Sequence, residues 1–243
     1  MILALGYWQG DQPQAMRLAR FMADLEPKRR TDCALVFSRR QDCELTAEAR
    51  ATMLYCAKKF SIHMLTNQSG SDGWPAGCNG LWQGTIAGCV GMALRGAAPF
   101  SAIFTFEPDC VPLSQNWIGR LIEAHRETIK AGKRITGDVR DWPTPHVNGN
   151  LIMEASCYLD HPSLEKCPPN VAWDLWHAPV TLGEVRRGCH VIRSEHRARE
   201  IGEPQLVAMA HETAVYHGCK DQSAIEAARR MLLGETTREE ATA

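Results

Sequence analysis

The stretch AIFTFEPDCVPLSQNWIGRL, residues 102–121, decides how the rest of the chain is interpreted. Its apolar start predicts a buried strand that ends on Glu107 and Asp109, two carboxylates held between prolines, and a helix is expected from about Ser114. In open α/β sheets, ligands bind outside the carboxyl ends of the strands. The two carboxylates therefore stand where such a sheet would present a binding site.

Upstream of this stretch, apolar runs alternate with amphipathic segments. Strands are predicted at residues 1–8, 31–40 and 61–67, with helices between them at residues 10–27 and 46–60. An alternating order of strands and helices favours a parallel sheet with right-handed crossovers. The fold class predicted is therefore α/β, with a mostly parallel, Rossmann-like sheet flanked by helices.

Further elements follow on both sides of the opening stretch. They are a loop at 68–82, helices at 81–96 and 116–132, a short strand at 134–139, a loop at 141–150, and a strand or helix at 151–159. The sequence has no internal repeat and no clear second-domain boundary. Its polar tail, residues 234–243, is expected to be disordered.

Composition excludes several classes of protein. The chain has 243 residues, of which 44% are hydrophobic and 23% charged, and its net charge of −1 is not that of a basic nucleic-acid-binding surface. Its 10 cysteines show no CxxC spacing, which argues against a zinc ribbon and for reduced thiols in the cytoplasm. The start MILALGYWQGDQ is not expected to be a signal peptide, and no apolar run is long enough to predict a membrane span.

Two short motifs carry the chemistry. Glu107 and Asp109 are two residues apart and would face the same side of an extended chain, where hard oxygen ligands suit Mg²⁺ or Mn²⁺ on a diphosphate. Near the end of the chain, His217 could bind a metal and Lys220 a phosphate. The alternatives are a helix cap or arginine partner for Glu107, and an ordinary surface loop for residues 217–221.

The order of these motifs resembles that of nucleotide-sugar glycosyltransferases of the GT-A type, over about residues 1–225. FTFEPDCVP, residues 104–112, resembles their acidic DxD motif, and HGCKD, residues 217–221, resembles their late histidine with its glycine and lysine. GCNGLWQGTIAGC, residues 77–89, resembles the asparagine-containing stretch one helix earlier, which would make Asn79 a nucleotide contact.

The resemblance implies one GT-A-like domain with two halves. Residues 1–113 would bind the nucleotide-sugar, and residues 114–233 would form the acceptor and catalytic half. It also implies Mn²⁺, or Mg²⁺, held by Asp109 and His217. The first acidic position is Glu107 rather than aspartate, so Glu107 is expected to reach the ribose or a water. Lys220 would offset the charge that builds on the leaving group.

The same resemblance assigns further donor contacts. Four residues at the first two strand ends would cradle the base and ribose of a UDP-sugar, such as UDP-glucose: Tyr7, Trp8, Ser38 and Arg39. Tyr7 or Trp8 would stack on the uracil, unless both are core aromatics. Asn148 and Asn150 would contact the sugar hydroxyls, unless Asn148 and Gly149 form a hairpin turn.

A general base and an acceptor surface complete the prediction. Asp174 lies between Trp173 and Trp176, and apolar surroundings would raise its pKa, as suits the base of an inverting transfer. Its alternatives are a helix cap or a buried ion pair, and a retaining transfer would need no such base.

The acceptor side is predicted from a basic segment. Its arginines, which fit an anionic acceptor, are Arg186, Arg187, Arg193, Arg197 and Arg199. Small enzymes of this kind resemble bacteriophage glycosyltransferases that modify hydroxymethyl-pyrimidines in DNA. A solvated charged face and a small-molecule, lipid-linked or protein acceptor stay open. The competing functions are a nucleotidyltransferase, a nucleic-acid-binding accessory protein without catalysis, and a transferase that binds donor without turnover.

Overall fold

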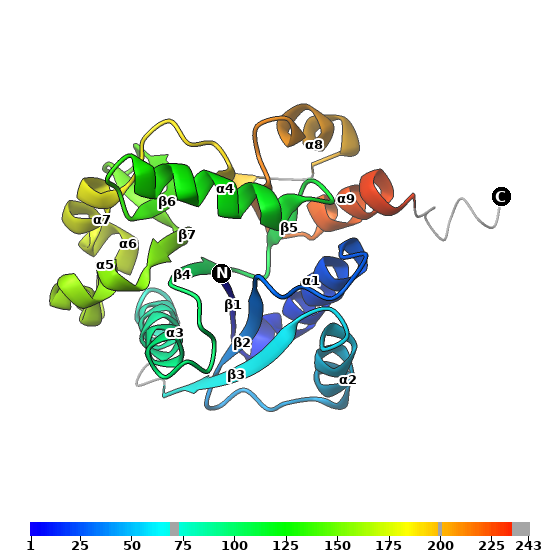
Figure 1. Ribbon diagram of the computed structural model, residues 1–243, viewed down its shortest axis with the longest axis horizontal. Coiled ribbons are helices and arrows are strands. Elements are labelled where there is room, and N and C mark those ends of the chain that lie inside the picture. The colour runs from blue at the N-terminus through cyan, green and yellow to red at the C-terminus, as the bar shows by residue number, and fades with distance from the viewer. Residues whose placement is uncertain (69–72, 199–200, 235–243) are drawn as a thin grey trace.

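The computed structural model describes residues 1–68, 73–198 and 201–234. A six-stranded sheet in the order β3-β2-β1-β4-β7-β6 forms its centre (Figure 1). The strands are β1 (Ile2–Tyr7), β2 (Ala34–Arg40), β3 (Ser61–Asn67), β4 (Ala102–Phe106), β6 (Ile135–Arg140) and β7 (His146–Glu154). The first four strands are parallel, and β7 runs antiparallel to both β4 and β6.

The helices pack on both faces of this sheet. They are α1 (Gln12–Leu25), α2 (Ala47–Cys56), α3 (Ala76–Leu94), α4 (Trp117–Lys130), α5 (Ala155–Asp160), α6 (Trp173–Trp176), α7 (Ala178–Glu184), α8 (Glu203–Ala210) and α9 (Ser223–Leu233). Two 3-10 helices, Gln9–Asp11 and Pro162–Glu165, complete the description. Among these described helices, none is both long and apolar enough to cross a membrane.

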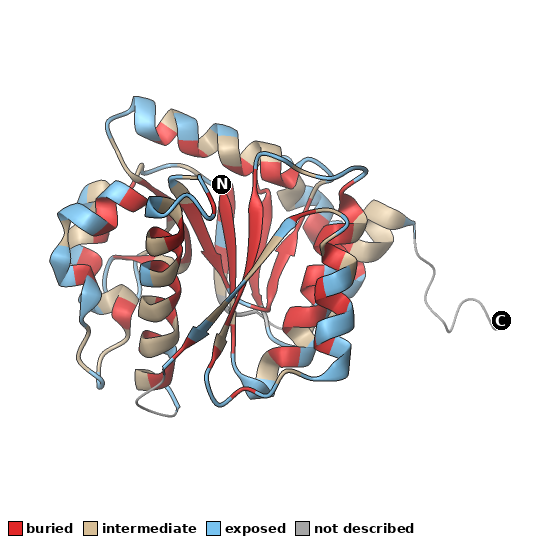
Figure 2. Ribbon diagram, turned by 60° about the horizontal axis from the view of Figure 1, so that its bottom comes forward, coloured by how far each residue is buried: buried red, intermediate tan, exposed pale blue. Residues whose placement is uncertain are grey.

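Each central strand contributes to two cores, because successive side chains point to opposite faces. In β1, Leu3 and Leu5 lie in the core with α1, α2 and α4, whereas Ile2 and Ala4 lie in the core with α3. Burial on both faces explains why these strands read as continuous apolar runs. Figure 2 shows the central strands as a buried band between helices with exposed outer faces, whereas the edge strand β3 is mostly intermediate or exposed. The α/β fold class predicted from the sequence is confirmed.

Three boundaries differ from the sequence-based predictions. Helix α3 begins at Ala76, so half of the loop expected at 68–82 is helical. Residues 146–150 belong to β7, not to a loop, and the Asn148–Gly149 pair lies inside that strand rather than in a turn. The segment 151–159 divides at Glu154, where β7 ends and α5 follows. Of the expected disordered tail, residues 235–243 lie outside the described part of the chain.

A second, three-stranded sheet brings the end of the chain to the end of β4. Its strands are β5 (Cys110–Pro112), β8 (Ile192–Ala198) and β9 (Val215–Cys219), in the order β5-β9-β8. Cys110 pairs with His217 across the antiparallel β5–β9 ladder. Next to His217, Gly218 has a φ of +135°, and a Cβ there would collide with the carbonyl oxygen of Glu195. Only glycine allows β9 to approach β8 so closely at this point.

Candidate functional site

The two carboxylates and the late histidine meet at the carboxyl end of β4. The chain turns after β4, with the Cys110 amide donating to the Glu107 carbonyl at 3.0 Å, so Glu107 and Asp109 are brought together by a turn and not by an extended strand. His217 arrives from β9, and its Nε2 lies 3.1 Å from Glu107 Oε2 and 3.4 Å from Asp109 Oδ1. The ligand atoms of all three groups lie within 4.8 Å of one another.

Charge shapes this cluster strongly. The Asp109 side chain is only 2% exposed, and Lys220 Nζ lies 2.9 Å from its Oδ2. Burial acts to raise the pKa of Asp109, but the hydrogen bond and charge of His217, together with the Lys220 ammonium, hold it well below its usual range. Burial opposes the charged form of His217, yet its two carboxylate partners raise its pKa to about 9.

These groups fit a divalent cation. Both oxygens of Asp109 are buried and, apart from their contacts with His217 and Lys220, have no polar partner in the described part of the chain. His217 Nδ1 is also buried and has no hydrogen-bond partner among the residues that the structure describes. Carboxylate oxygens with one imidazole are a suitable ligand set for Mn²⁺ or Mg²⁺. Glu107, Asp109 and His217 would hold the ion, which would supply positive charge to the oxygens of a bound diphosphate.

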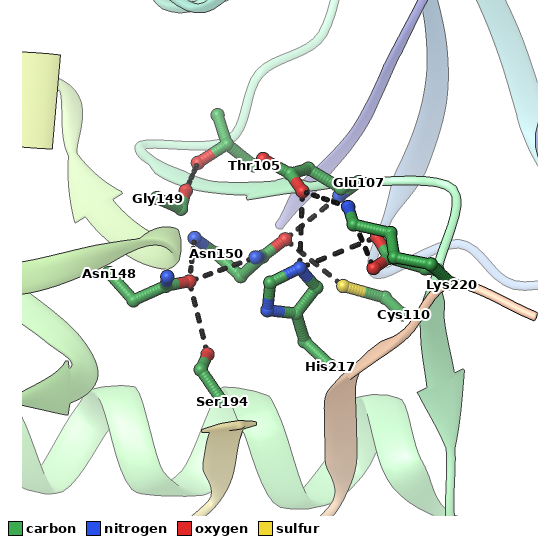
Figure 3. A network of polar contacts seen from close by, with 10 residues as sticks. Thr105, Glu107, Cys110, Asn148, Gly149, Asn150, Ser194, His217 and Lys220 are labelled. Carbon is green, nitrogen blue, oxygen red and sulfur yellow. Dashed lines mark hydrogen bonds and ion pairs between the residues drawn. The ribbon is translucent and has the colours of Figure 1, made fainter. Parts of the chain in front are cut away.

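Asn150 holds the acidic turn in place, as Figure 3 shows. Its side chain is completely buried, and Oδ1 accepts hydrogen bonds from the Glu107 amide at 2.8 Å and from the Cys110 thiol at 3.0 Å. Its Nδ2 donates to Asn148 Oδ1 at 2.9 Å, and the Ser194 hydroxyl donates to the same oxygen at 3.0 Å. The network joins β7 to the turn and to β8. Because Asn150 is completely buried and both of its side-chain polar atoms are bonded within the protein, it is not exposed to a sugar, whereas Asn148 is only partly buried.

Asp174 lies beside His146. The carboxylate Oδ2 is 3.8 Å from His146 Nε2, while Oδ1 accepts a hydrogen bond from the Leu175 amide at 2.9 Å. Burial raises the pKa of Asp174, and the charge of Glu107 acts in the same direction, while the charge of His146 lowers it. The imidazole is itself oriented by a hydrogen bond from Nδ1 to the Thr144 carbonyl at 2.7 Å. Asp174 thus has a raised pKa, to which burial contributes most and the charge of Glu107 adds.

Several predicted donor contacts lie inside the protein. Tyr7 is fully buried in the core, and burial raises its pKa. Ser38 is fully buried too, bonded to Thr85 at 2.7 Å and to Asn67 at 2.7 Å. Asn79 connects α3 to the segment before α6, donating to the Val171 carbonyl at 2.8 Å and accepting from the Trp173 amide at 2.9 Å. In this arrangement none of the three presents a free side chain to a ligand.

Other predicted contacts remain accessible. Trp8 is 52% exposed at the end of β1, and its amide donates to Asp11 Oδ1 at 2.7 Å. Arg39 is partly buried; its guanidinium donates to the Cys43 carbonyl, while its Nε has no hydrogen-bond partner within residues 1–68, 73–198 and 201–234. Trp8 and Arg39 therefore keep surface that a base or ribose could contact, and their roles stay predictions.

The basic segment is only partly described. Arg187 is exposed and Arg186 partly buried, while Arg193 is paired with Glu195 at 2.9 Å. The side chain of Arg197 and the whole of Arg199 lie outside the described residues. The predicted contact of this segment with an acceptor is therefore left as a prediction.

Two groups near the cluster were missed from the sequence. Burial raises the pKa of Asp11 to about 6. The charge of Glu107 also raises this pKa, whereas the charge of Lys220 lowers it. The sequence signal that could have identified Asp11 was its position, as an acidic residue just after the first strand. Ser194 was also missed: its amide donates to Asp138 Oδ2 at 2.9 Å, in addition to its hydroxyl contact with Asn148. A lone serine in a charged segment gave no signal for that position.

Comparison with known proteins places the fold. No family model and no curated protein sequence matches the chain. Among solved structures, an active-site variant of the galactosyltransferase LgtC matches with a TM-score of 0.56 and 11% identity, over 100% of this chain and 99% of that one. The bifunctional glycosyltransferase WbbM matches with a TM-score of 0.52 and 7% identity, over 89% of this chain. Mouse xyloside xylosyltransferase 1 matches with a TM-score of 0.50 and 11% identity, over 89% of this chain and 96% of that one.

These likenesses show the fold. It is the fold of the GT-A glycosyltransferases, as the resemblance in sequence motifs implied. The chain spans 45% of the WbbM chain, but 99% of the LgtC chain. At such low identities the chemistry must be argued from the site itself, since one fold hosts many functions.

Proposed function

We propose that the chain is a metal-dependent glycosyltransferase of the GT-A type. It moves a sugar from a nucleoside diphosphate donor, specifically a UDP-sugar such as UDP-glucose, to a hydroxyl acceptor. One observation carries the proposal: Glu107, Asp109 and His217 converge within 4.8 Å at the carboxyl edge of a parallel sheet. That edge is where open α/β sheets bind their ligands.

The donor would be held from two sides. Asp109, His217 and Glu107 bind Mn²⁺, or Mg²⁺, against the diphosphate, and Lys220 contributes positive charge to the leaving group. The exposed ring of Trp8 supports a contact with the base, and the partly buried guanidinium of Arg39 supports one with the ribose. We keep Tyr7, Ser38 and Asn79 as supports beneath this surface, since their side chains are buried.

Asp174 is the proposed general base of an inverting transfer. Its raised pKa suits proton uptake from an acceptor hydroxyl near neutral pH. Asn148 is the proposed sugar contact, while Asn150 acts indirectly by holding the acidic turn. In a retaining transfer no base would be required, and replacement of Asp174 by asparagine would then leave much of the turnover rate intact.

The acceptor we propose is a hydroxyl group, with a hydroxymethyl-pyrimidine in bacteriophage DNA as its most specific form. The exposed Arg187 supports an anionic acceptor. The pairing of Arg193 with Glu195 weakens the support from that arginine, because its charge is already compensated. A cytoplasmic setting is part of the same proposal and agrees with the nine free cysteines among the described residues.

A ligand panel tests the donor site. The full chain is heated with UDP-sugars, GDP-sugars or free nucleotides, each with Mn²⁺ or with EDTA. A ligand at a hundred times its Kd adds about 2.7 kcal/mol of stability, which raises Tm by roughly 5–10 °C for a chain of this size. We expect UDP and UDP-sugars to raise the Tm of wild type only when Mn²⁺ is present, and to leave the Tm of Asp109→Asn unchanged.

The panel separates the candidate functions. Release of free UDP from UDP-glucose in the presence of Mn²⁺ would support the transferase. Stabilisation by nucleoside triphosphates in preference to nucleotide-sugars would favour a nucleotidyltransferase. If no nucleotide stabilises the chain with either metal, the transferase proposal is wrong, and duplex DNA with hydroxymethyl-cytosine becomes the next ligand for a binding assay.

A further inference from the structure

Lys220 occupies the approach to the two carboxylates. Its Nζ lies 2.9 Å from Asp109 Oδ2 and 3.4 Å from Glu107 Oε2. Figure 3 shows the side chain reaching from the end of β9 toward Glu107 and His217. A lysine placed beside a diphosphate site would be expected to point at the phosphates. Here it instead contacts the same oxygens that a divalent cation would take.

The ammonium compensates part of the negative charge on the buried Asp109 carboxylate. Asp109 is buried, and among the described residues its oxygens have no polar partner besides His217 and Lys220. An isolated buried carboxylate is costly, so a nearby cation is needed whenever the site holds no metal. Lys220 and His217 supply the positive charge within 3.5 Å of it. A divalent ion on Asp109 and Glu107 would make the lysine contact redundant.

Lys220 is free to leave without a change in the backbone. Its side chain is 70% exposed, although its tip reaches the buried carboxylate. A lysine carries its point charge on a flexible four-carbon stem. Rotation about that stem moves the ammonium from the carboxylates to the exposed rim of the same site, where phosphate oxygens would be its next partners.

We propose that Lys220 is a tethered counter-ion that occupies the metal-binding carboxylates until a metal and a nucleoside diphosphate bind together and displace it. The inference rests on the proposed function, because it takes Glu107, Asp109 and His217 as the metal ligands. A metal ion that binds alone must displace the Lys220 ammonium from Asp109 and Glu107, and the ammonium then has no new partner. A diphosphate gives the displaced ammonium a new partner, so metal and nucleotide strengthen each other's binding.

Titration of the full chain with Mn²⁺, followed by the electron paramagnetic resonance signal of the free ion, tests this directly. Wild type and Lys220→Gln are compared without nucleotide and with saturating UDP. Without UDP, we expect Lys220→Gln to bind Mn²⁺ about tenfold more tightly than wild type, which corresponds to about 1.4 kcal/mol. UDP should tighten Mn²⁺ binding to wild type at least about tenfold more than it tightens binding to the variant.

Three control variants complete the test. Lys133→Gln makes the same substitution at a lysine that donates to the Gly183 carbonyl, and should leave the Mn²⁺ affinity unchanged. Lys220→Arg keeps the charge and should retain the low wild-type affinity for Mn²⁺ alone. Asp109→Asn should abolish Mn²⁺ binding, which identifies the site being measured.

The outcomes that overturn the inference differ from those that overturn the function. Equal Mn²⁺ affinity in wild type and Lys220→Gln, with binding lost in Asp109→Asn, would leave the metal site standing and exclude the counter-ion. If Lys220→Gln binds Mn²⁺ more tightly than wild type by the same factor without and with UDP, the lysine acts only by charge repulsion, and the counter-ion proposal is also excluded. Mn²⁺ binding that is absent from every variant, or insensitive to Asp109→Asn, would contradict the proposed metal site itself.

Discussion

At the scale of single residues, Asn150 shows how a buried amide can serve a site without touching a ligand. Its oxygen accepts from two groups of the acidic turn, and its nitrogen connects that turn to Asn148. Groups behind metal ligands hold them in orientation, and their loss usually weakens metal binding. The sugar contact expected of Asn150 from the sequence is thus replaced by a positioning role in our proposal.

Replacement of Asn150 tests that role. Asn150→Ala leaves the Glu107 amide without its acceptor, so we expect a loss of about 1–3 kcal/mol in unfolding free energy. We also expect Mn²⁺ affinity to fall about 10- to 100-fold. Urea unfolding and Mn²⁺ titration measure the two effects. Asn150→Asp keeps an acceptor of the same shape and should retain more of the stability. Destabilisation with unchanged Mn²⁺ affinity would mean that Asn150 is merely structural.

At the scale of elements, the contact between α3 and β3 depends on small residues in the helix. A Cβ on Gly84 would lie 2.7 Å from the Asn67 side-chain oxygen. Asn67 cannot move aside cheaply, because it is buried and bonded to Ser38. Gly80, one turn earlier in the same helix, faces open space. Gly84 therefore allows the close approach of α3 to β3, whereas Gly80 makes no such contact.

The same substitution at these two positions should have opposite effects. Gly80→Ala should raise the unfolding free energy by about 0.5–1 kcal/mol, because alanine favours the helix. Gly84→Ala should lower it by about 1–3 kcal/mol, because the added methyl overpacks the contact with β3. Thermal and urea unfolding of the two variants provide the comparison. Stabilisation by both would show that α3 does not approach β3 as closely as described.

A second contact between elements makes stability depend on pH. Arg134, just before β6, pairs with Glu184 at the end of α7 at 2.7 Å, and the Glu184 side chain is 18% exposed. The hydrogen bond from Arg134 lowers the pKa of Glu184 to about 2, against the effect of burial. A carboxyl whose pKa is lower in the folded state stabilises the fold above its ordinary pKa, and this stability is lost as pH falls toward the folded value.

We therefore expect acid to weaken wild type more than a variant without this carboxylate. Between about pH 5 and pH 2, wild type should lose about 1–2 kcal/mol more unfolding free energy than Glu184→Gln, after allowance for solvent screening. Urea unfolding at a series of pH values measures the difference. Parallel pH profiles for the two proteins would show that the Arg134 contact contributes nothing.

At the scale of the whole molecule, the two predicted halves share their cores. One core contains Leu5 of β1 together with Trp117 of α4 and Ile225 of α9. The other contains Val36 of β2 together with Leu151 of β7. Strand β4 also takes β7 as a neighbour, and β5 takes β9. Neither core can form completely from residues 1–113.

Cooperativity tests the division at residue 113. The full chain should unfold in a single transition, with calorimetric and van't Hoff enthalpies equal, because elements of both halves lie in the same cores. A fragment of residues 1–113 should show no cooperative transition, since β4 and β5 would lose their partners. Calorimetry and circular dichroism of both proteins decide the matter. A cooperatively folded fragment would make the first half an independent domain.

The sequence by itself determined the order of strands and helices through β4 and the place of the two carboxylates that follow it. Strands β1, β2 and β4 are rich in apolar residues because they are buried between the two layers of helices, and such apolar runs can be recognised in the sequence alone. The carboxylates at the end of β4 and the late His217 could likewise be singled out, since strand ends and polar clusters are local features.

The tertiary structure alone decided what each polar side chain contacts. Asn79 binds the segment before α6 and Ser38 binds Thr85, although both stood at positions predicted to meet a nucleotide. Lys220 lies on the carboxylates rather than at a distance from them. Periodicity reports whether a position is buried, but hydrogen-bond partners come from segments far away in the chain. Which groups meet is therefore decided only when the sheet and its helices pack.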